Sequence, residues 1–411
     1  MKQETIDIVK STVPVLEEHG EAITKQFYLN LFASHPELRN VFNQTNQKKN
    51  RQQKALANAV YQAAKHIDNL GAILPVVNQI AQKHRSIGIQ PEHYPIVGEN
   101  LLQAIKDVLS EAATEEIITA WAEAYDEIAD AFINVENHLR EDVLASGGWE
   151  GYRPLKVVKK VKESDVITSF YLQCEDAGPL PSYSPGQYLS IKADIPGEPI
   201  THIRQYSLSD APNKNTYRIS VKREDAIGEN PDGVVSHYLH DVVQEGDTLY
   251  FSAPAGDFTL NAKEEKPLVL IAGGVGLTPL MSMLNTAIKE KPSRDIIWIQ
   301  AAVNGHVHAF SDHVHSLADE HDNLSAYVCY EKPTQDDRAA GCFQFEGYLN
   351  AEKLDEAIPD KNADYYFCGP KPFMQAIYTI LKNWGIPEEN IHFEFFGPQD
   401  ELVEQPVALG V

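Results

Sequence analysis

The sequence predicts a multi-domain protein with three successive folds: an all-α domain, an antiparallel β-barrel, and an α/β domain built on a parallel sheet. Length is the first observation, because 411 residues are too many for one ordinary hydrophobic core. The second is the spacing of apolar residues, which changes twice along the chain. We therefore expect a helical domain at 1–140, a linker at 141–152, a barrel at 153–262 and an α/β domain at 263–411.

The first 140 residues carry a helical repeat and almost no strand pattern. Apolar residues recur at intervals of three and four, as in Ile6, Val9, Val13 and Leu16. Such a one-sided stripe is typical of helices that pack on a core. Prolines at positions 14, 36, 75 and 91 stand where helices should begin or break. The Gly-rich stretch at 146–152 then predicts a linker.

Between 154 and about 260 the pattern becomes strand-like. Apolar and polar residues alternate around Val157 and Ile167, and turn clusters rich in Pro, Gly, Ser and Asp separate the short runs. Short strands with regular turns are typical of a small antiparallel barrel.

From about residue 266 short apolar runs alternate with helical patterns. The runs at 268–271, 296–299, 325–328 and 365–367 resemble strands that are buried on both faces. Strands that alternate with helices predict βαβ units and a parallel sheet.

Composition excludes several classes of protein. A net charge of −24 argues against nucleic-acid or anionic-membrane partners, which need clustered Lys and Arg. No stretch approaches the roughly 20 apolar residues of a membrane span, so we expect no integral membrane segment. The four cysteines lie far apart without metal-type spacing, which favours free thiols. With no signal-like N-terminus, a cytoplasmic location is expected.

One histidine, His84, is the main candidate for a metal ligand in the helical domain, although His35, His66 and His93 are alternatives on residue type alone. Haem iron needs one strong proximal nitrogen ligand. Pro36 and Phe42, six residues apart, precede it, and Gln52 stands 32 residues before it. Gln52 and Leu56 are four apart and so share a helix face.

This set resembles the globin family. The resemblance implies that Phe42 packs on the haem, that His84 binds the iron of haem b, and that Tyr28, Gln52 and Leu56 line the opposite side of the pocket. It also implies that Glu136 and Tyr94 hold the outer nitrogen of the His84 ring, a feature of globins that perform oxygen chemistry. Lys83 matches the family and is a possible partner of Glu136; an exposed helix lysine is the alternative.

The second half resembles the ferredoxin-reductase family of flavoproteins. Its motifs imply an FAD site that contains Tyr188 (in Gly-Gln-Tyr), the run Arg204, Gln205, Tyr206 and Ser207, and Ser236. The arginine would bind the pyrophosphate of FAD. The stretch 224–232 before Ser236 is longer than the family norm.

Two further motifs resemble the nicotinamide half of the same family. A glycine turn follows the first strand of the α/β domain and consists of Gly273, Gly274, Val275, Gly276, Leu277 and Thr278. Such turns let a pyrophosphate approach the backbone. A loop near the nicotinamide would contain Cys368, Gly369 and Pro370. An aromatic segment over the flavin would contain Phe395, Phe396, Gly397 and Pro398.

Taken together, these motifs cover nearly the whole chain and resemble the flavohaemoglobin family. The resemblance implies an NAD(P)H-dependent nitric oxide dioxygenase that converts NO and O₂ to nitrate, with electrons passing from NADH or NADPH to FAD and then to haem. Two other readings remain at this point: an oxygen sensor or store, and a general flavin reductase with accessory haem. The stretch 299–304, which ends the second strand of the α/β domain, lacks the arginine expected for a 2′-phosphate, and this favours NADH. Protein partners cannot be inferred.

Overall fold

The computed structural model describes residues 1–41, 51–175, 178–213, 215–228, 231–261 and 263–396. By its contacts the chain divides into two compact units. The first contains 1–152 together with 192–204, and the second contains 153–191 and most of the chain from 205 onward. Among the described residues, no helix is both long enough and apolar enough to cross a membrane.

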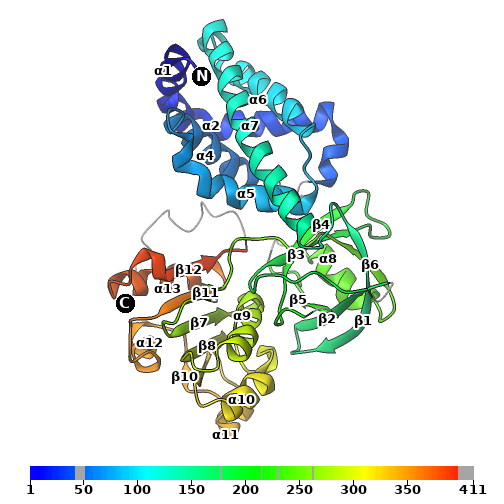
Figure 1. Cartoon of the computed structure of the whole chain (residues 1–411), viewed down its shortest axis with the longest axis vertical. Helices are drawn as coiled ribbons and strands as arrows, with labels where there is room; N and C mark the ends of the chain where they lie inside the picture. The colour runs from blue at the N-terminus through cyan, green and yellow to red at the C-terminus, as the bar shows by residue number, and fades with distance from the viewer. Residues whose placement is uncertain (42–50, 176–177, 214, 229–230, 262, 397–411) are drawn as a thin grey trace. The chain divides into compact units, whose positions relative to one another are not determined.

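The part of the first unit that precedes residue 146 is helical where the structure describes it, as the apolar repeat predicts (Figure 1). Its helices are α1 Gln3–Ser11, α2 Val13–Ser34, α4 Arg51–Lys65, α5 Leu74–Ile87, α6 His93–Leu109 and α7 Glu115–Ala145, with short 3₁₀ turns at η1 Pro36–Asn40, η2 Leu70–Ile73 and η3 Ser110–Ala112. Helix α2 packs on α4 and α6, and α5 packs on α7.

Local signals set the ends of the helices that matter for the site. The Thr114 side chain accepts the N–H of Ile117 and so caps the start of α7. Gly88, in the left-handed conformation with φ of 84°, ends α5 directly after the turn that carries His84. At its other end α7 continues to Ala145, into the segment expected to be a linker.

Within the described part of the barrel, six strands form one sheet in the order β4-β3-β6-β1-β2-β5. Their bounds are β1 Arg153–Lys162, β2 Ile167–Cys174, β3 Tyr188–Ala193, β4 His202–Ser207, β5 Tyr217–Lys222 and β6 Thr248–Phe251. A bridge between Leu208, just after β4, and Ile219 on β5 joins the two edges of the sheet. The two edge strands of the sheet therefore meet at this point, as in a small barrel. A short helix α8 (Val234–His237) and a π-helical turn η4 (Tyr238–Val242) follow β5.

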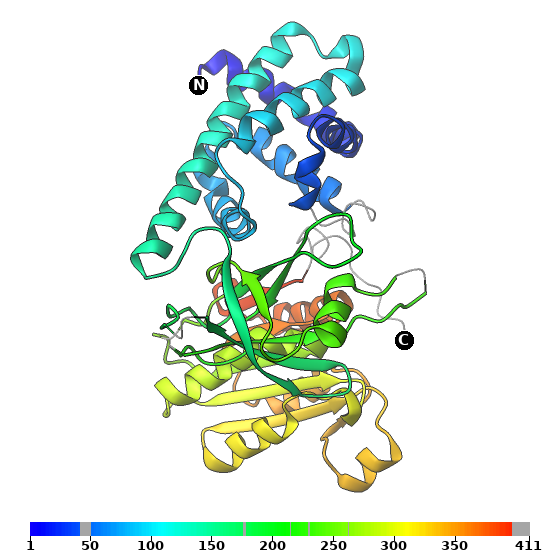
Figure 2. The same ribbon diagram turned by 90° about the vertical axis from the view of Figure 1, so that its right-hand side faces the viewer.

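The α/β part is a parallel sheet with helices beside it (Figure 2). Strand order is β10-β9-β8-β7-β11-β12, with β7 Leu268–Gly273, β8 Ile296–Ala302, β9 Leu324–Tyr330, β10 Phe345–Glu346, β11 Asp364–Cys368 and β12 Ile391–Glu394. The helices are α9 Leu277–Glu290, α10 Ser311–Glu320, α11 Gln335–Ala340, α12 Ala351–Ala357 and α13 Lys371–Asn383, with 3₁₀ turns at η5 Gly274–Gly276, η6 Gly305–Val307 and η7 Glu388–Asn390. The four strands expected from apolar runs are confirmed as β7, β8, β9 and β11.

Most of the barrel and the whole parallel sheet lie in the second unit, where polar contacts around Asp210 join them. Asp210, in the turn after β4, accepts from Ser282 on α9 at its carbonyl (2.6 Å) and from Asn285 at Oδ1 (2.8 Å). The guanidinium of Arg218 on β5 lies 4.8 Å from the ring centroid of Phe310. These contacts fix the two sheets relative to each other.

Two helix glycines in the first unit provide a matched test of packing. Gly20→Ala should raise the free energy of unfolding by about 0.5–1 kcal/mol, because alanine is the better helix former and its Cβ would lie 3.5 Å from Ala57, an ordinary contact. Gly98→Ala should instead lower it by roughly 1–3 kcal/mol, since its Cβ would lie 2.5 Å from the Tyr125 ring. Thermal unfolding of both variants measures the difference. Equal effects would contradict the α6–α7 packing.

Candidate functional site

His84, Tyr94 and Glu136 meet in the helical unit, although 52 residues separate the first from the last. His84 lies near the end of α5, Tyr94 at the start of α6 and Glu136 late in α7. Glu136 Oε1 lies 2.8 Å from His84 Nδ1 and accepts from the Tyr94 hydroxyl at 2.5 Å. His84 Nδ1 and the Tyr94 hydroxyl are 3.2 Å apart. One carboxylate oxygen therefore holds both the ring and the tyrosine.

Burial makes this arrangement rigid. The Glu136 side chain is fully buried, while that of His84 is 30% exposed. Burial and the hydrogen bond to Glu136 raise the pKa of Tyr94 far above its usual value, so the hydroxyl stays a donor. Both contacts of the imidazole use Nδ1, and among the described residues Nε2 has no hydrogen-bond partner. The ring thus has one fixed nitrogen and one nitrogen available to a metal.

A fourth residue, Arg140, completes the cluster and was not among the candidates. Its guanidinium lies 3.5 Å from Glu136 Oε2, one helical turn away on α7, and donates to the Ile89 carbonyl at 2.6 Å. The spacing of four between Glu136 and Arg140 was a sequence signal for this pair. The possible pairing of Lys83 with Glu136 is not found: Lys83 is exposed, and Glu136 pairs with Arg140 and His84.

The other expected haem-pocket residues lie on α2 and α4. Tyr28 is buried on α2, and its ring stacks with Phe32 at 5.8 Å between centroids. Gln52 and Leu56 lie one turn apart on α4, and Leu56 packs against the same hydrophobic core as Tyr28. Phe42 lies outside the described residues.

In the barrel, the expected flavin residues occupy adjacent strands. Tyr188 is buried at the start of β3. Arg204, Gln205, Tyr206 and Ser207 end β4, and Gln205 Nε2 donates to the Ser190 hydroxyl on β3 at 3.3 Å. The strand order β4-β3 thus brings the two sequence motifs together.

The Ser236 side chain holds the base of the loop 224–232 through two hydrogen bonds. Its hydroxyl accepts the Glu224 N–H at 3.2 Å and donates to the Gly233 carbonyl at 2.9 Å. The Gly233 N–H in turn donates to the Glu224 carbonyl at 2.7 Å. These bonds close the base of the loop 224–232, so the hydroxyl is already engaged within the protein.

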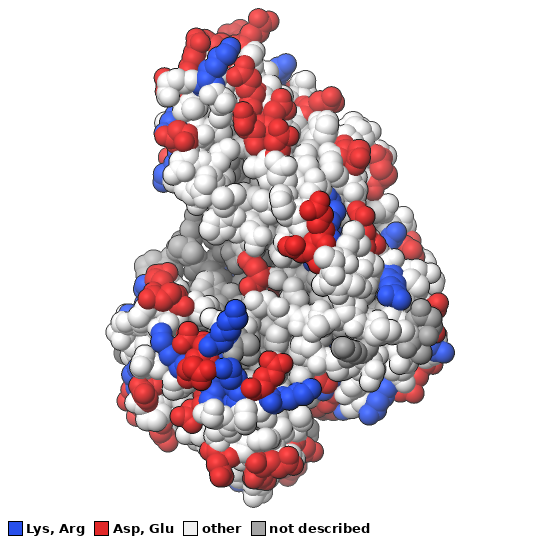
Figure 3. Space-filling view, in the orientation of Figure 1, with Lys and Arg blue, Asp and Glu red and all other residues white. Residues whose placement is uncertain are grey.

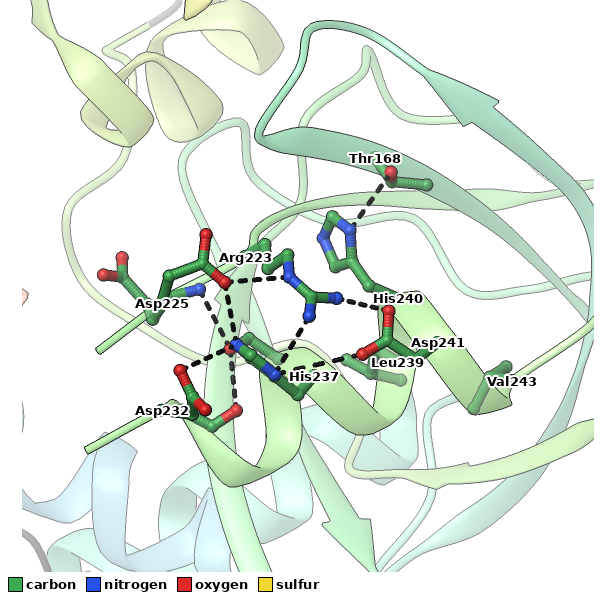
Figure 4. A network of polar contacts seen from close by, with 12 residues as sticks. Thr168, Arg223, Asp225, Asp232, His237, Leu239, His240, Asp241 and Val243 are labelled. Carbon is green, nitrogen blue, oxygen red and sulfur yellow. Dashed lines mark hydrogen bonds and ion pairs between the residues drawn. The ribbon is translucent and has the colours of Figure 1, made fainter.

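A charged network holds the same loop (Figure 4). Arg223 donates to Asp225 at 2.9 Å, contacts Asp241, and approaches His237 Nδ1 at 3.2 Å. His237 Nε2 lies 3.1 Å from Asp225 and 3.5 Å from Asp232. The long loop is therefore tied at both ends to α8 and η4. Residues 229–230 lie outside the described residues.

At the carboxyl edge of the parallel sheet, three separate motifs become neighbours because β7, β11 and β12 are adjacent strands. A Cβ on Gly276 would lie 2.2 Å from the Cys368 carbonyl oxygen. Cβ atoms on Gly273 and Gly369 would lie 2.9 and 2.6 Å from the Phe373 ring. The turn after β7 is thus packed directly on the loop after β11. At Gly276 the obstacle is backbone, so only glycine fits there, whereas a side chain at Gly273 or Gly369 would have to displace the Phe373 ring.

Glu394, at the end of β12, is a second residue at a site that the sequence motifs do not indicate. It pairs in register with Cys368 on β11, and Oε2 is buried without a hydrogen-bond partner among the described residues. Burial, and secondarily the Asp257 carboxylate, raises the pKa of Glu394 to about 8. Burial also raises the pKa of the Cys368 thiol well above its usual value. A buried polar atom with no partner, at this edge, is typical of a site that is completed by a ligand.

The aromatic segment follows directly. Phe395 is partly buried and Phe396 is 48% exposed. Gly397 and Pro398 lie outside the described residues. The Phe396 ring, two residues after Glu394, is therefore accessible, and an accessible aromatic ring can stack on a planar ring system.

The fold and the two sites define a class of protein: a globin-type helical domain joined to a flavin- and nicotinamide-type oxidoreductase module. Three protein-family models match the chain in the same order. The globin family model matches residues 25–132, the oxidoreductase FAD-binding domain matches 154–260, and the oxidoreductase NAD-binding domain matches 270–379.

Similarity extends over the full chain. It is 55% identical to the flavohemoprotein of Halalkalibacterium halodurans over 403 residues, 98% of each chain, and 52% identical to that of Bacillus subtilis over 405 residues, 98% and 99% of the two chains. A crystal structure of a flavohemoglobin from Malassezia yamatoensis with bound FAD and heme matches with a TM-score of 0.83 at 26% identity, covering 96% of this chain and 99% of that one. The chain therefore belongs to the flavohaemoprotein family.

A shorter structure matches the second half. It is the FAD/NAD-binding domain of a nitric oxide dioxygenase from Vibrio cholerae, with a TM-score of 0.55 and 38% identity, covering 60% of this chain and 99% of that one.

The raised pKa of Glu394 predicts that the free energy of unfolding depends on pH. The folded state keeps this carboxyl protonated up to about pH 8, whereas the unfolded state ionises near 4.5. The folded state thus binds more protons between these values, and stability falls as pH rises through that window. Glu394→Gln should remove this loss, on the order of 3 kcal/mol between pH 5 and pH 8.

Thermal unfolding of wild type and Glu394→Gln across pH 5–8 measures this effect. Glu389→Gln, an exposed glutamate in the turn before β12, is the matched control and should follow the wild type. A constant difference between Glu394→Gln and wild type over this range would show that Glu394 ionises normally.

Proposed function

We propose that this chain is a nitric oxide dioxygenase that consumes NO, O₂ and NAD(P)H and forms nitrate. When bound, FAD and haem b would supply the redox chemistry, with the flavin accepting electrons from the nicotinamide and the iron receiving them one at a time. The observation that carries the proposal is the fully buried Glu136, which holds the outer nitrogen of His84 in a chain that also has a complete reductase module.

Each residue of the helical cluster has a defined part in this proposal. His84 would bind the iron through Nε2 while its Nδ1–H donates to Glu136. A carboxylate acceptor makes the imidazole more electron-rich, which favours oxygen chemistry over reversible oxygen storage. Tyr94 would fix the position of the carboxylate, and Arg140 would offset its charge.

The opposite side of the pocket would be formed by Tyr28, Gln52 and Leu56. The Tyr28 hydroxyl is the candidate donor to a bound diatomic ligand, with Gln52 beside it, and Leu56 would keep the pocket apolar. Phe42 would pack on the haem plane, and Lys83 would lie at its margin.

In the reductase module, Arg204 and the end of β4 would hold the FAD pyrophosphate, and Tyr188, Tyr206 and Ser207 would surround the flavin ring. Phe396 would cover the other flavin face. The glycine turn at Gly273–Gly276 would hold the pyrophosphate of the dinucleotide, and Cys368, Gly369 and Pro370 would border the nicotinamide. Glu394, being protonated, can donate a hydrogen bond at this edge.

The partners of this reaction are small molecules. On the face shown in Figure 3, Lys and Arg lie among Asp and Glu, and the net charge of the chain is −24. A nucleic acid or an anionic membrane would need clustered Lys and Arg instead. We also propose a cytoplasmic location, because Cys174, Cys329, Cys342 and Cys368 are free thiols.

Replacing the iron ligand tests the function. His84→Ala should lose the haem Soret band and NO consumption, while FAD content and NADH-dependent ferricyanide reduction remain. Loss of NO consumption alone separates a dioxygenase from a general flavin reductase. An oxygen store would instead show a stable oxygenated spectrum and no steady NADH consumption under NO in the wild type. A normal Soret band in His84→Ala would overturn the ligand assignment.

Removing the charge of Glu136 tests the positioning role. Glu136→Gln keeps the size and a hydrogen bond, so the midpoint potential of the haem should rise and NO turnover should fall by about ten- to a hundredfold. Ferricyanide reduction should not change. Glu141→Gln, exposed on the same helix, is the control. Unchanged potential and turnover in Glu136→Gln would mean that Glu136 only stabilises the fold.

A further inference from the structure

The carboxyl edge of the parallel sheet also includes the ends of β8 and β9, on the other side of β7 from β11 and β12. The glycine turn follows β7, in the middle of the sheet, and the nicotinamide loop follows its neighbour β11 on one side. A dinucleotide that is held at its pyrophosphate by the turn after β7 must therefore extend its adenosine half to the other side, over the ends of β8 and β9. Adjacent strands lie about 4.8 Å apart, so the adenosine ribose reaches these strand ends.

The residue at this position is Glu331. It directly follows β9, and its N–H donates to the Ala302 carbonyl at the end of β8 (3.0 Å). Its Oε1 accepts from the Tyr348 hydroxyl at 3.1 Å and lies 3.1 Å from Lys332 Nζ. The side chain is 26% exposed, so the carboxylate is held in place and still accessible. The hydrogen bond from Lys332 lowers the pKa of Glu331, so it is ionised at neutral pH.

The basic residues near Glu331 are already occupied. Arg338 contacts both carboxylate oxygens of Glu346, and Lys353 donates to the carbonyls of Glu346 and Tyr348 at 2.5 and 2.6 Å. Lys332 pairs with Glu331 itself. A phosphate at this edge would therefore compete with a carboxylate for Arg338 and for Lys332, and with two backbone carbonyls for Lys353.

A second carboxylate reinforces this charge. Asp337 is buried at the start of α11 and accepts from the N–H of Thr334 at 2.7 Å and of Gly305, just beyond β8, at 3.3 Å. Backbone hydrogen bonds lower its pKa, so it is also ionised. Both strand ends thus meet negative charge.

We propose that Glu331 is the residue that makes this chain select NADH over NADPH. Its carboxylate accepts a hydrogen bond from the free 2′-hydroxyl of the adenosine ribose and repels a 2′-phosphate at the same place. The inference rests on the proposed use of a nicotinamide dinucleotide and adds the identity of that substrate.

The test is the ratio of kcat/KM for NADH and NADPH in the full-length, FAD-loaded protein, with ferricyanide as electron acceptor. The wild type should prefer NADH by about tenfold or more, as expected for a like-charge contact. Glu331→Gln should reduce this preference by about fivefold or more, mainly by a lower KM for NADPH, because it removes the repulsion and releases Lys332.

Glu290→Gln is the matched control. It makes the same change of charge at the end of α9, which returns from the carboxyl edge to the opposite edge of the sheet, and should leave the ratio as in the wild type. A wild type that uses NADPH as well as NADH would overturn the proposal, and so would equal effects of Glu331→Gln and Glu290→Gln.

An independent measurement uses only the wild type. 5′-ADP should inhibit NADH oxidation more strongly than 2′,5′-ADP, and the reverse order would overturn the proposal. Because ferricyanide accepts electrons from the flavin, neither assay depends on NO turnover. Failure of the dioxygenase proposal would therefore leave these results unaffected.

Discussion

The hydrogen bond between His84 and Glu136 is the interaction on which the helical unit depends for its chemistry. It joins the end of α5 to the last turns of α7, and Tyr94 ties the start of α6 to the same oxygen. A fully buried carboxylate is costly unless donors surround it. The His84 ring and the Tyr94 hydroxyl bind Oε1, and the Arg140 guanidinium forms an ion pair with Oε2 at 3.5 Å, so this one carboxylate links the three helices. The geometry of the imidazole follows from that packing.

In the second unit, the order of strands has the corresponding role. The motifs at Gly273, Cys368 and Glu394 are far apart in the sequence, but β7, β11 and β12 are adjacent and parallel, so their carboxyl ends meet. Gly276 packs against the Cys368 carbonyl closely enough to exclude any side chain. The polar contacts around Asp210 then hold this edge at a fixed position relative to the barrel that carries Tyr188 and Ser207.

Sequence patterns predicted the three folds and the strands of the parallel sheet because hydrophobic periodicity is a local property. They also predicted the meeting of His84, Tyr94 and Glu136, through resemblance rather than spacing. The spacing of four between Glu136 and Arg140 permits an ion pair, but the same spacing is common on exposed helices, where it contributes little, so it does not single out Arg140. The raised pKa of Glu394 could not be predicted, since it depends on burial and on Asp257, which lies more than a hundred residues earlier. The hydrogen bond by which Ser236 holds the base of the loop 224–232 could not be predicted either, since it depends on tertiary contacts.

Glu136 and Glu394 show how the same side chain acquires different chemistry. Both have buried carboxylate oxygens. Glu136 is surrounded by the hydroxyl of Tyr94, the imidazole of His84 and the guanidinium of Arg140, so its negative charge is compensated and can act on the ring. Glu394 faces a buried thiol and a second carboxylate, and its pKa of about 8 keeps it neutral. A charged acceptor suits the role proposed for His84 as an electron-rich metal ligand, and a neutral donor suits the nicotinamide site proposed at this edge. The environment of each glutamate therefore matches the redox step proposed for its own domain.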